Sequence, residues 1–383
     1  MRKVYVDNSA TSFPKAPGVS SAVKDFLDNV GCNVNRGGYQ SSYNTALEIL
    51  QTRKMLCELL CFAEPKNVVF TPGITYSLNM ILRGFLHEGD HVITTSMEHN
   101  GVMRPLHELS KGGVWYDIAG CASDGSLATK EIAALITAKT KAVVMTHASN
   151  VCGTVLPIAD VYEICRARGV KLIVDAAQTA GVLDIDMACI DALAFTAHKG
   201  LLAPQGLGGF IINSDMEQMV EPLITGGTGS LSHEITQPGF MPDKLESGTM
   251  NIPAIIGLKA SLEYIKSIGT KAIFEKEAEL AEDFIAQVSK LSGVRIVGKK
   301  NMTGALAVIS LDFANMDNSE MAATLDAEFG IMTRCGLHCA PNAHKTLGTY
   351  PHGTVRFSFG HLNTAEEVEY IAASVKEVLS RRA

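Results

Sequence analysis

Charged side chains are scarce in this 383-residue chain. Asp, Glu, Lys and Arg make up 19% of it, against roughly 25% in typical globular proteins. Long Lys/Arg runs are missing and the net charge is −7, which argues against a nucleic-acid binder. The first residues contain no apolar signal-peptide core, and no apolar stretch approaches the roughly 18 residues that suggest a membrane span. We therefore expect a soluble, cytoplasmic protein that binds neither nucleic acid nor a membrane.

Cysteine is present but lacks a ligand pattern. The nine cysteines are an odd number, and they show no CxxC spacing. This argues against a disulfide framework and against a zinc ribbon, so no metal site is predicted. Cys57 and Cys61 lie about one helical turn apart. With no second Cys/His pair nearby, core packing is favoured for both.

Short β-branched runs alternate with amphipathic segments along the first two thirds of the chain. Several runs are apolar at successive positions, which is typical of strands covered on both faces. The helical segments between them complete βαβ-like units. The sequence therefore predicts an α/β fold with a mainly parallel sheet and helices on both sides. The expected strands are 68–71, 91–94, 142–145, 171–174, 192–195 and 209–212.

The last part of the chain has a different pattern. Thr364 and Glu367 offer a capping box, and the apolar residues after them recur at helical spacing. A strand is expected at 308–311, before this helix. These elements predict a second, smaller α+β domain. The predicted division is a large α/β domain of residues 15–254 and a smaller domain of residues 1–14 and 255–383.

Three features lie where expected strands end, which is where open α/β sheets bind ligands. Asp175 closes a hydrophobic strand, as a helix N-cap or as a site residue. Lys199 follows the next strand, although most lysines simply reach solvent. Segment 71–79 passes from a strand through a glycine turn into a helix, whose first N–H groups suit a phosphate. The segment lacks the Walker Lys-Ser/Thr and is not a P-loop.

The combination of these features favours one cofactor, pyridoxal 5′-phosphate (PLP). Lys199 would form the imine with its aldehyde. Asp175 would pair with the pyridinium nitrogen and keep it protonated as an electron sink. Segment 71–79 would hold the phosphate. Each feature is weak alone, and only the set points to PLP.

Short motifs along almost the whole chain carry a resemblance to a known family. In their order and spacing they resemble the class V branch of fold-type I PLP enzymes. Within that branch the sequence is similar to the cysteine desulfurases, nearer the SufS-like group II than the IscS-like group. The motifs are YVDNSATS (5–12), NVNRG (33–37), EHN (98–100), SNVCGT (149–154), DAAQ (175–178), AHK (197–199), ESGT (246–249), RCGLHCA (334–340) and RFSFGHLNT (356–364).

The resemblance implies the cofactor-binding role of each matching residue. Lys199 would be the Schiff-base lysine, Asp175 the partner of the ring nitrogen, and Gln178 a donor to the ring oxygen. His99 would stack on the ring and relay protons. The implied phosphate ligands are Thr75, Thr196, His198 and, from the neighbouring subunit of a homodimer, Thr249, with Ile74 standing where the family often has Thr.

The resemblance also implies the substrate and the nucleophile. Asn150 and Arg356 would bind the α-carboxylate of L-cysteine, and Arg36 would line the site as it does in some relatives; a guanidinium fork suits a carboxylate. Cys339 takes the position of the family's nucleophilic cysteine, where Arg334 and His338 could favour a thiolate. The implied reaction has Lys199 remove the Cα proton and Cys339 accept the sulfur as a persulfide, releasing alanine.

Departures from the family leave alternatives open. Cys335 is a second thiol four residues before Cys339, read as neutral variation or, less favoured, as a resolving thiol. Segment 341–353 differs from that of SufS-like proteins. A selenocysteine lyase would use the same residues, whereas a class V aminotransferase or another PLP lyase would not need Cys339. A non-catalytic scaffold is a third reading. A SufE-like or SufU-like sulfur acceptor is expected by resemblance only.

Overall fold

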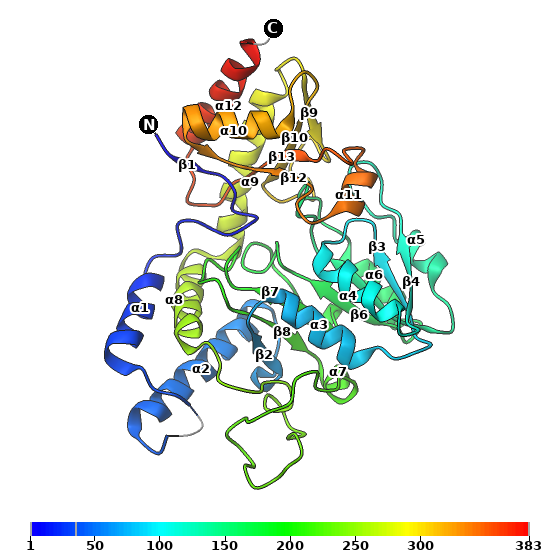
Figure 1. The fold of residues 1–383 in the computed structure, drawn as a ribbon, viewed down its shortest axis with the longest axis vertical. Coiled ribbons are helices and arrows are strands. Elements are labelled where there is room, and N and C mark those ends of the chain that lie inside the picture. Colours follow the sequence, from blue (N-terminus) through cyan, green and yellow to red (C-terminus); the bar gives the residue numbers. More distant parts are fainter. Residues whose placement is uncertain (1, 35–36, 382–383) are drawn as a thin grey trace.

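The computed structural model describes residues 2–34 and 37–381, and Figure 1 shows a large lower part and a smaller upper part. A seven-stranded sheet forms the centre of the lower part, in the order β2-β8-β7-β6-β5-β3-β4. All neighbouring pairs are parallel except those that β8 makes with β2 and β7. Its strands are β2 (Val68–Thr71), β3 (His91–Thr95), β4 (Trp115–Ala119), β5 (Thr140–Thr146), β6 (Lys171–Asp175), β7 (Ala192–Thr196) and β8 (Gly208–Ile212).

Alternate residues of these strands enter two different hydrophobic cores. In β6, Leu172 and Val174 face one core and Ile173 faces the other. Both faces are therefore buried, which is why the strands are apolar at successive positions. One face is covered by α3 (Ile74–Phe85), α4 (Asn100–Ser110) and α7 (Ser214–Met219), and the other by α2 (Gln40–Leu59), α5 (Thr129–Leu135), α6 (Ile158–Arg166) and α8 (Ile252–Ile268). Helix α1 (Val19–Asp25) packs on α8.

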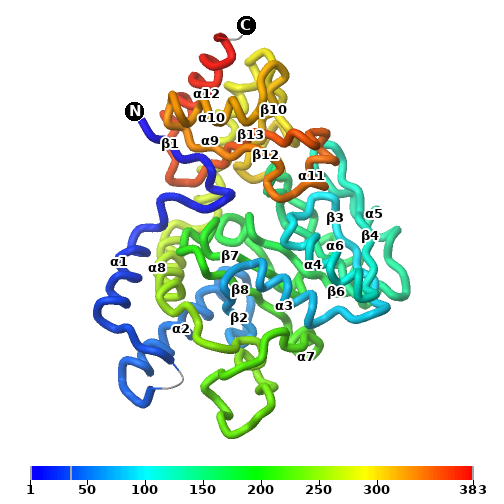
Figure 2. The backbone as a smooth tube through the Cα atoms, in the orientation of Figure 1, coloured from blue at the N-terminus to red at the C-terminus, as the bar shows by residue number. Residues whose placement is uncertain are grey.

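The upper part is built on a four-stranded antiparallel sheet in the order β12-β13-β10-β9. The N-terminus joins it, because β1 pairs in parallel with β11; Figure 2 traces this blue segment down to α1. The remaining elements are β1 (Val4–Tyr5), α9 (Thr270–Val288), β9 (Val294–Val297), β10 (Val308–Phe313), α10 (Asn318–Phe329), β11 (Ile331–Met332), β12 (Arg334–Gly336), α11 (Pro341–Thr346), β13 (Thr354–Ser358) and α12 (Ala365–Ser380), with short helical turns at Phe26–Val30, Pro65–Asn67 and Met187–Cys189.

The predicted α/β fold class is confirmed, and every strand expected from an apolar run is present. The capping box of Thr364 and Glu367 also forms at the start of α12. The sequence missed β4, because this strand at the sheet edge is largely exposed and carries no apolar run. The packing expected of Cys61 is wrong: Cys57 is buried in α2, but Cys61 follows the end of that helix and is exposed. Within residues 2–34 and 37–381, no helix is long and apolar enough to cross a membrane.

Candidate active site

The carboxyl ends of four neighbouring parallel strands meet at one edge of the large sheet. Strand β6 ends at Asp175, and β7 ends at Thr196, three residues before Lys199. His99 follows β3, and Asn150 follows β5. The fold thus gathers most of the predicted site residues at the edge where open α/β sheets bind ligands.

Lys199 lies in the turn after β7, beside a small cavity of about 50 Å³ that Gln178 and Glu277 also line. Burial lowers the pKa of its amine to about 8, against the opposing effect of the Asp175 carboxylate. The positive charge of Arg356 adds to the lowering. An amine in this setting loses its proton more readily than an exposed lysine and becomes a nucleophile or a base.

Asp175 is both a structural cap and a charged partner of the site. Its carboxyl group is 4% exposed, and Oδ1 accepts a hydrogen bond from the backbone N–H of Ala177 at 2.9 Å. Burial raises the pKa of Asp175, whereas the bond from Ala177 and the charge of Lys199 act to lower it. Gln178 is buried and its Nε2 donates to the carbonyl oxygen of Ser9 at 3.2 Å, so the N-terminal segment orients it.

His99 is the N-cap of α4, and its ring nitrogen Nδ1 accepts a hydrogen bond from the N–H of Gly101 at 2.9 Å. Burial, helped by the charges of Lys199 and Arg334, lowers the pKa of His99 to about 4. The ring is therefore neutral at physiological pH and carries its proton on Nε2. A neutral aromatic ring with one outward N–H can stack on a planar group and pass a proton.

Glu98, beside His99, was not assigned a role from the sequence. The side chain is fully buried, and its Oε1 accepts hydrogen bonds from the hydroxyl of Thr95 and from the N–H of Thr146. Burial raises the pKa of Glu98 to about 8, and the charge of Asp175 acts in the same direction. A neutral Glu98 adds no second negative charge beside Asp175. Only the burial of Glu98 distinguishes it from an ordinary polar residue of this motif, and burial cannot be read from the sequence.

The segment predicted to hold a phosphate lies at the same edge. Strand β8 places Thr71 and Thr196 on either side of Gly208, in register with both. A Cβ on Gly208 would lie 2.8 Å from both the Cα of Gly73 and the carbonyl oxygen of Phe195, so only glycine lets the turn approach β7 this closely. Helix α3 begins after Gly73 and directs its first N–H groups outward.

The side chains of the predicted phosphate ligands differ in exposure. Ile74 is half-buried, Thr75 is exposed, and Thr196 is 2% exposed. The backbone of His198 is fixed by the N-terminal segment, because its carbonyl accepts a hydrogen bond from the N–H of Ser12 at 2.8 Å. Burial, and then the charge of Lys199, lowers the pKa of His198 to about 4. Its buried Nδ1 has no hydrogen-bond partner among the described residues.

Thr249 lies on an exposed segment between β8 and α8. It lines a cavity of about 370 Å³ together with Thr71 and Tyr76, so it is near the start of α3 in its own chain. The same segment is fixed by Glu246, which forms a buried bidentate ion pair with Arg53 of α2 (3.0 and 2.7 Å).

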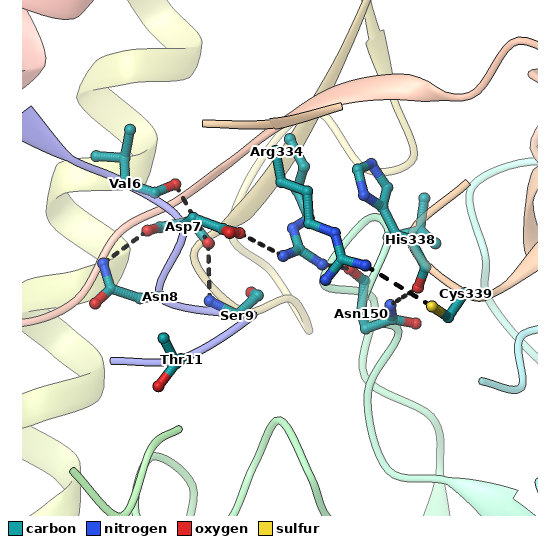
Figure 3. A network of polar contacts seen from close by, with 12 residues as sticks. Val6, Asp7, Asn8, Ser9, Thr11, Asn150, Arg334, His338 and Cys339 are labelled. Atoms are coloured by element: carbon teal, nitrogen blue, oxygen red, sulfur yellow. Dashed lines mark hydrogen bonds and ion pairs between the residues drawn. The ribbon is translucent and has the colours of Figure 1, made fainter. Parts of the chain in front are cut away.

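The Cys339 loop descends from the upper sheet onto this edge, as Figure 3 shows. The thiol is exposed, and Nη2 of Arg334 approaches its Sγ at 3.7 Å. The backbone is tied to the lower part at two points. The carbonyl of His338 accepts from Nδ2 of Asn150 at 2.7 Å, and the carbonyl of Cys339 accepts from the N–H of Asn100 at 2.7 Å. These two bonds hold the loop that carries the sulfur next to the ends of β3 and β5.

Arg356 is buried in β13 and already has partners. Its Nη2 lies 2.6 Å from Oδ1 of Asp7, and its Nη1 donates to the carbonyl of Asn150 at 3.0 Å. The buried Nε has no partner in the described part of the chain. Any carboxylate that bound Arg356 would therefore share it with Asp7, a residue of the first motif whose role was missed. Arg36, which was predicted to line the substrate site, lies outside the described residues.

One expectation about the neighbours of Cys339 changes. The ring of His338 is buried and bound to Thr354, and burial lowers its pKa to about 2. It is neutral and cannot act as a cation beside the sulfur, so Arg334 is the cation there. Cys335 lies between Arg334 and Gly336 in β12, where side chains alternate. Burial, and then the charge of Asp317 at the N-cap of α10, raises the pKa of the Cys335 thiol.

Comparisons with known proteins agree with this geometry. Residues 4–371 match the family described as aminotransferase class-V. A probable cysteine desulfurase of Methanothermobacter thermautotrophicus is 30% identical over 98% of this chain and 94% of the relative. The structure of the cysteine desulfurase of Thermococcus onnurineus, 30% identical, superposes with a TM-score of 0.92 over 99% of this chain and 95% of that one. Cysteine desulfurase CsdA of Escherichia coli, 28% identical, gives 0.89 over 100% and 96%.

Proposed function

The chain belongs to the aminotransferase class-V family, and from this premise we propose that it binds PLP as a Schiff base on Lys199. The residues at the sheet edge fit that cofactor. The Lys199 amine, with its pKa lowered to about 8, is ready to attack an aldehyde. The unpartnered Nδ1 of His198 would gain a phosphate oxygen as its partner, as buried polar atoms require.

The same residues suggest how each part of PLP would be held. Asp175 would bind the ring nitrogen, Gln178 the ring oxygen, and His99 the face of the ring. The phosphate would take the N–H groups at the start of α3, where a helix favours anions. Its side-chain ligands would be Thr75, Thr196, His198 and Thr249.

The proposed reaction is the desulfuration of L-cysteine. When bound, PLP would supply an electron sink for the carbanion formed at Cα. Lys199 would remove the Cα proton, and His99 would relay a proton through Nε2. Arg356 and Asn150 would bind the α-carboxylate, Arg356 while still paired with Asp7.

Cys339 would receive the sulfur. A bond forms between its Sγ and the substrate sulfur while the carbon–sulfur bond breaks, and the carbon takes a proton to give L-alanine. The enzyme would then carry a persulfide, which two equivalents of an external thiol would reduce to sulfide while they form a disulfide. The observation that carries this proposal is the exposed Cys339 thiol beside Arg334, on a loop bonded to Asn150 and Asn100. L-Selenocysteine would use the same groups.

The test is to incubate the protein with L-cysteine and a thiol reductant and to measure alanine and sulfide. Cys339→Ala should abolish sulfide release and keep the visible absorbance of bound PLP. Cys61→Ala is the matched control, because Cys61 is also exposed and unpaired, and it should behave like the wild type. Undiminished turnover of Cys339→Ala would favour an aminotransferase or another PLP lyase.

The cofactor has its own test. Borohydride reduction of the yellow protein, followed by peptide mass mapping, should place the reduced cofactor on Lys199. Protein that gains no visible absorbance with PLP would contradict the proposal and favour a non-catalytic scaffold.

We further propose a homodimer. Helix α2 exposes Tyr43, Leu47 and Leu50, by 58%, 57% and 41%, at the spacing of one helix face. An apolar stripe of this kind is typical of a surface that a partner covers. Leu47→Glu should shift the mass measured by light scattering from dimer to monomer. A wild-type monomer would rule out a phosphate contact of Thr249 across the dimer.

The finer assignments rest on the sequence resemblance. We propose a SufS-like enzyme that passes sulfur to a SufE-like or SufU-like protein for iron–sulfur cluster assembly in the cytoplasm. We also propose the division into residues 15–254 and residues 1–14 with 255–383. Transfer of labelled sulfur from Cys339 to candidate acceptors would test the first of these.

A further inference from the structure

Two buried histidines lie together under the Cys339 loop. His338 is 3% exposed and His344, on α11, is fully buried; their ring centroids are 5.5 Å apart. Nδ1 of His338 and Nε2 of His344 have no hydrogen-bond partner among the described residues. An unpaired buried polar group destabilises the folded state, so this pair requires an explanation.

The hydrogen-bond chain behind His338 fixes which of its nitrogens carries the proton. The hydroxyl of Ser310 donates to the carbonyl of Val151 at 2.7 Å, which uses its only proton. The hydroxyl of Thr354 must therefore donate to Ser310, at 2.9 Å. Thr354 can then only accept from Nε2–H of His338, at 3.1 Å. Since burial keeps the ring neutral, its Nδ1 is an acceptor.

The unpaired nitrogen of His344 is a donor, whereas that of His338 is an acceptor. Nδ1 of His344 lies 2.6 Å from the hydroxyl of Thr349. The carbonyl of His344 is 3.5 Å from that hydroxyl and already accepts the N–H groups of Thr349 and Tyr350. The Thr349 hydroxyl therefore donates its hydrogen bond to Nδ1 of His344. The proton of the neutral His344 ring then lies on Nε2. An unpaired donor and an unpaired acceptor thus lie on two buried rings whose centroids are 5.5 Å apart.

We propose that His344 is a positioning residue for Cys339: its Nε2–H binds Nδ1 of His338, directly or through one water, and so holds the strained backbone that presents the thiol. This proposal rests on the proposed sulfur transfer to Cys339. His338 and Cys339 are consecutive non-glycine residues with φ of 47° and 59°. Such left-handed conformations are unfavourable for non-glycine residues and persist only when their surroundings enforce them.

The contacts already described fix only part of the left-handed backbone at His338 and Cys339. Asn150 and Asn100 hold the two carbonyls, and Thr354 holds one side of the His338 ring. A bond from His344 would hold the other side and fix the ring rotation. Helix α11 is well placed to anchor it, because Ala343 and Leu347 pack in a small core with Val151 and Val297.

Two substitutions of His344 separate the two nitrogens. In His344→Asn the amide takes the place of Nδ1, so the Thr349 contact is kept and the donor to His338 is lost. In His344→Gln the amide nitrogen takes the place of Nε2, so the donor to His338 is kept and the Thr349 contact is lost. The matched control is His91→Asn: His91 is 4% exposed and binds Thr140 through Nδ1 at 2.8 Å, at the opposite end of β3.

The measurements are kcat and KM for L-cysteine, and backbone hydrogen exchange of residues 335–346 in the holoenzyme. His344→Asn should lower kcat roughly tenfold or more, as misplacement of a reacting group does, with little change in KM and faster exchange of the loop. His344→Gln should stay close to the wild type in both. His91→Asn should change neither.

Equal behaviour of the Asn and Gln variants would overturn the proposal, whether both are impaired or both are normal. If His344→Asn does not fold, His338→Gln replaces it, because this variant keeps a donor for Thr354 and lacks the acceptor at Nδ1. It should show the same loss of kcat and the same loop exchange, and normal exchange would overturn the proposal. Sulfide release that persists in Cys339→Ala would instead refute the proposed function. Hydrogen exchange of the loop would still report on the contact between the two histidines.

Discussion

Nη2 of Arg356 lies 2.6 Å from Oδ1 of Asp7, although 349 positions separate the two residues in the chain. Arg356 is in β13 of the upper sheet. Asp7 follows β1, and β1 belongs to the same part of the fold because it pairs with β11. The guanidinium is 1% exposed and the carboxylate 18%. The ion pair neutralises a buried cation and helps to fix the orientation of the Arg356 guanidinium.

Loss of the Asp7 carboxylate should destabilise the fold. Asp7→Ala leaves Arg356 buried without its counter-ion, which should lower the free energy of unfolding by about 2–4 kcal/mol. Asp7→Asn should cost less, because the amide oxygen still accepts a hydrogen bond. Urea denaturation measures both. Glu275→Ala, which removes an exposed pair with Lys271, is the control and should cost less than about 1 kcal/mol. Equal losses in Asp7→Ala and Glu275→Ala would contradict the prediction.

The buried pair of Arg53 and Glu246 makes a second stability prediction. Oε1 of Glu246 also accepts from the N–H of Phe70, and the Arg53 guanidinium lies 4.7 Å from the Phe70 ring centroid. Glu246→Leu alone should lower the free energy of unfolding by about 3–5 kcal/mol, because it leaves a buried cation. The double variant with Arg53→Met should recover part of that loss in a urea titration. A double variant less stable than the single one would show that the charge is not the cause.

The pH dependence of stability should carry the signature of Glu277. This α9 residue is buried, its Oε1 accepts from the N–H of His361 at 3.0 Å, and burial raises its pKa from 4.5 to about 8. Between these values the unfolded chain has released a proton that the folded chain keeps. The free energy of unfolding therefore falls as pH rises from about 4.5 to about 8.

Glu277→Gln removes this titration and keeps an oxygen for His361. It should match the wild type near pH 4.5 and exceed its stability near pH 8 by an amount on the order of a few kcal/mol. Urea midpoints across this range measure the difference. The control Glu275→Gln changes an exposed carboxyl two residues away and should run parallel to the wild type. A gap between Glu277→Gln and the wild type that does not widen with pH would refute the assignment.

Burial explains both what the sequence predicted and what it missed. Strands such as β5 and β6 were recognisable because both of their faces are apolar. Asp175 and Lys199 were recognisable because they follow such strands. Strand β4 was missed because it is exposed. The division near residue 255 stays a prediction; it falls within α8 (Ile252–Ile268), and this helix packs on α1 and α2 of the lower part.

The partners of the site residues were beyond reach of sequence reasoning for a different reason. Asp7 meets Arg356, and Asn150 meets the carbonyl of His338, only because two sheets approach each other. Such contacts depend on the relative position of segments far apart in the chain, which no local pattern encodes. The same reasoning applies to His338, whose expected cationic role failed because the ring is buried against Thr354.

The Lys199 amine should be unusually reactive in the apoprotein. Burial lowers its pKa to about 8, so about half of it is neutral at pH 8. Competitive acetylation with a limiting reagent, followed by peptide mass spectrometry from about pH 6 to 10, should give Lys199 a titration midpoint near 8. Asp175→Asn removes the larger of the two negative charges, Asp175 and Asp7, that favour the protonated amine, and it should move the midpoint lower still. The exposed Lys271 serves as the reference and should not respond to Asp175→Asn. A Lys199 midpoint that coincides with that of Lys271 would show that the amine is not desolvated, and the argument for it as the PLP lysine would lose its physical basis.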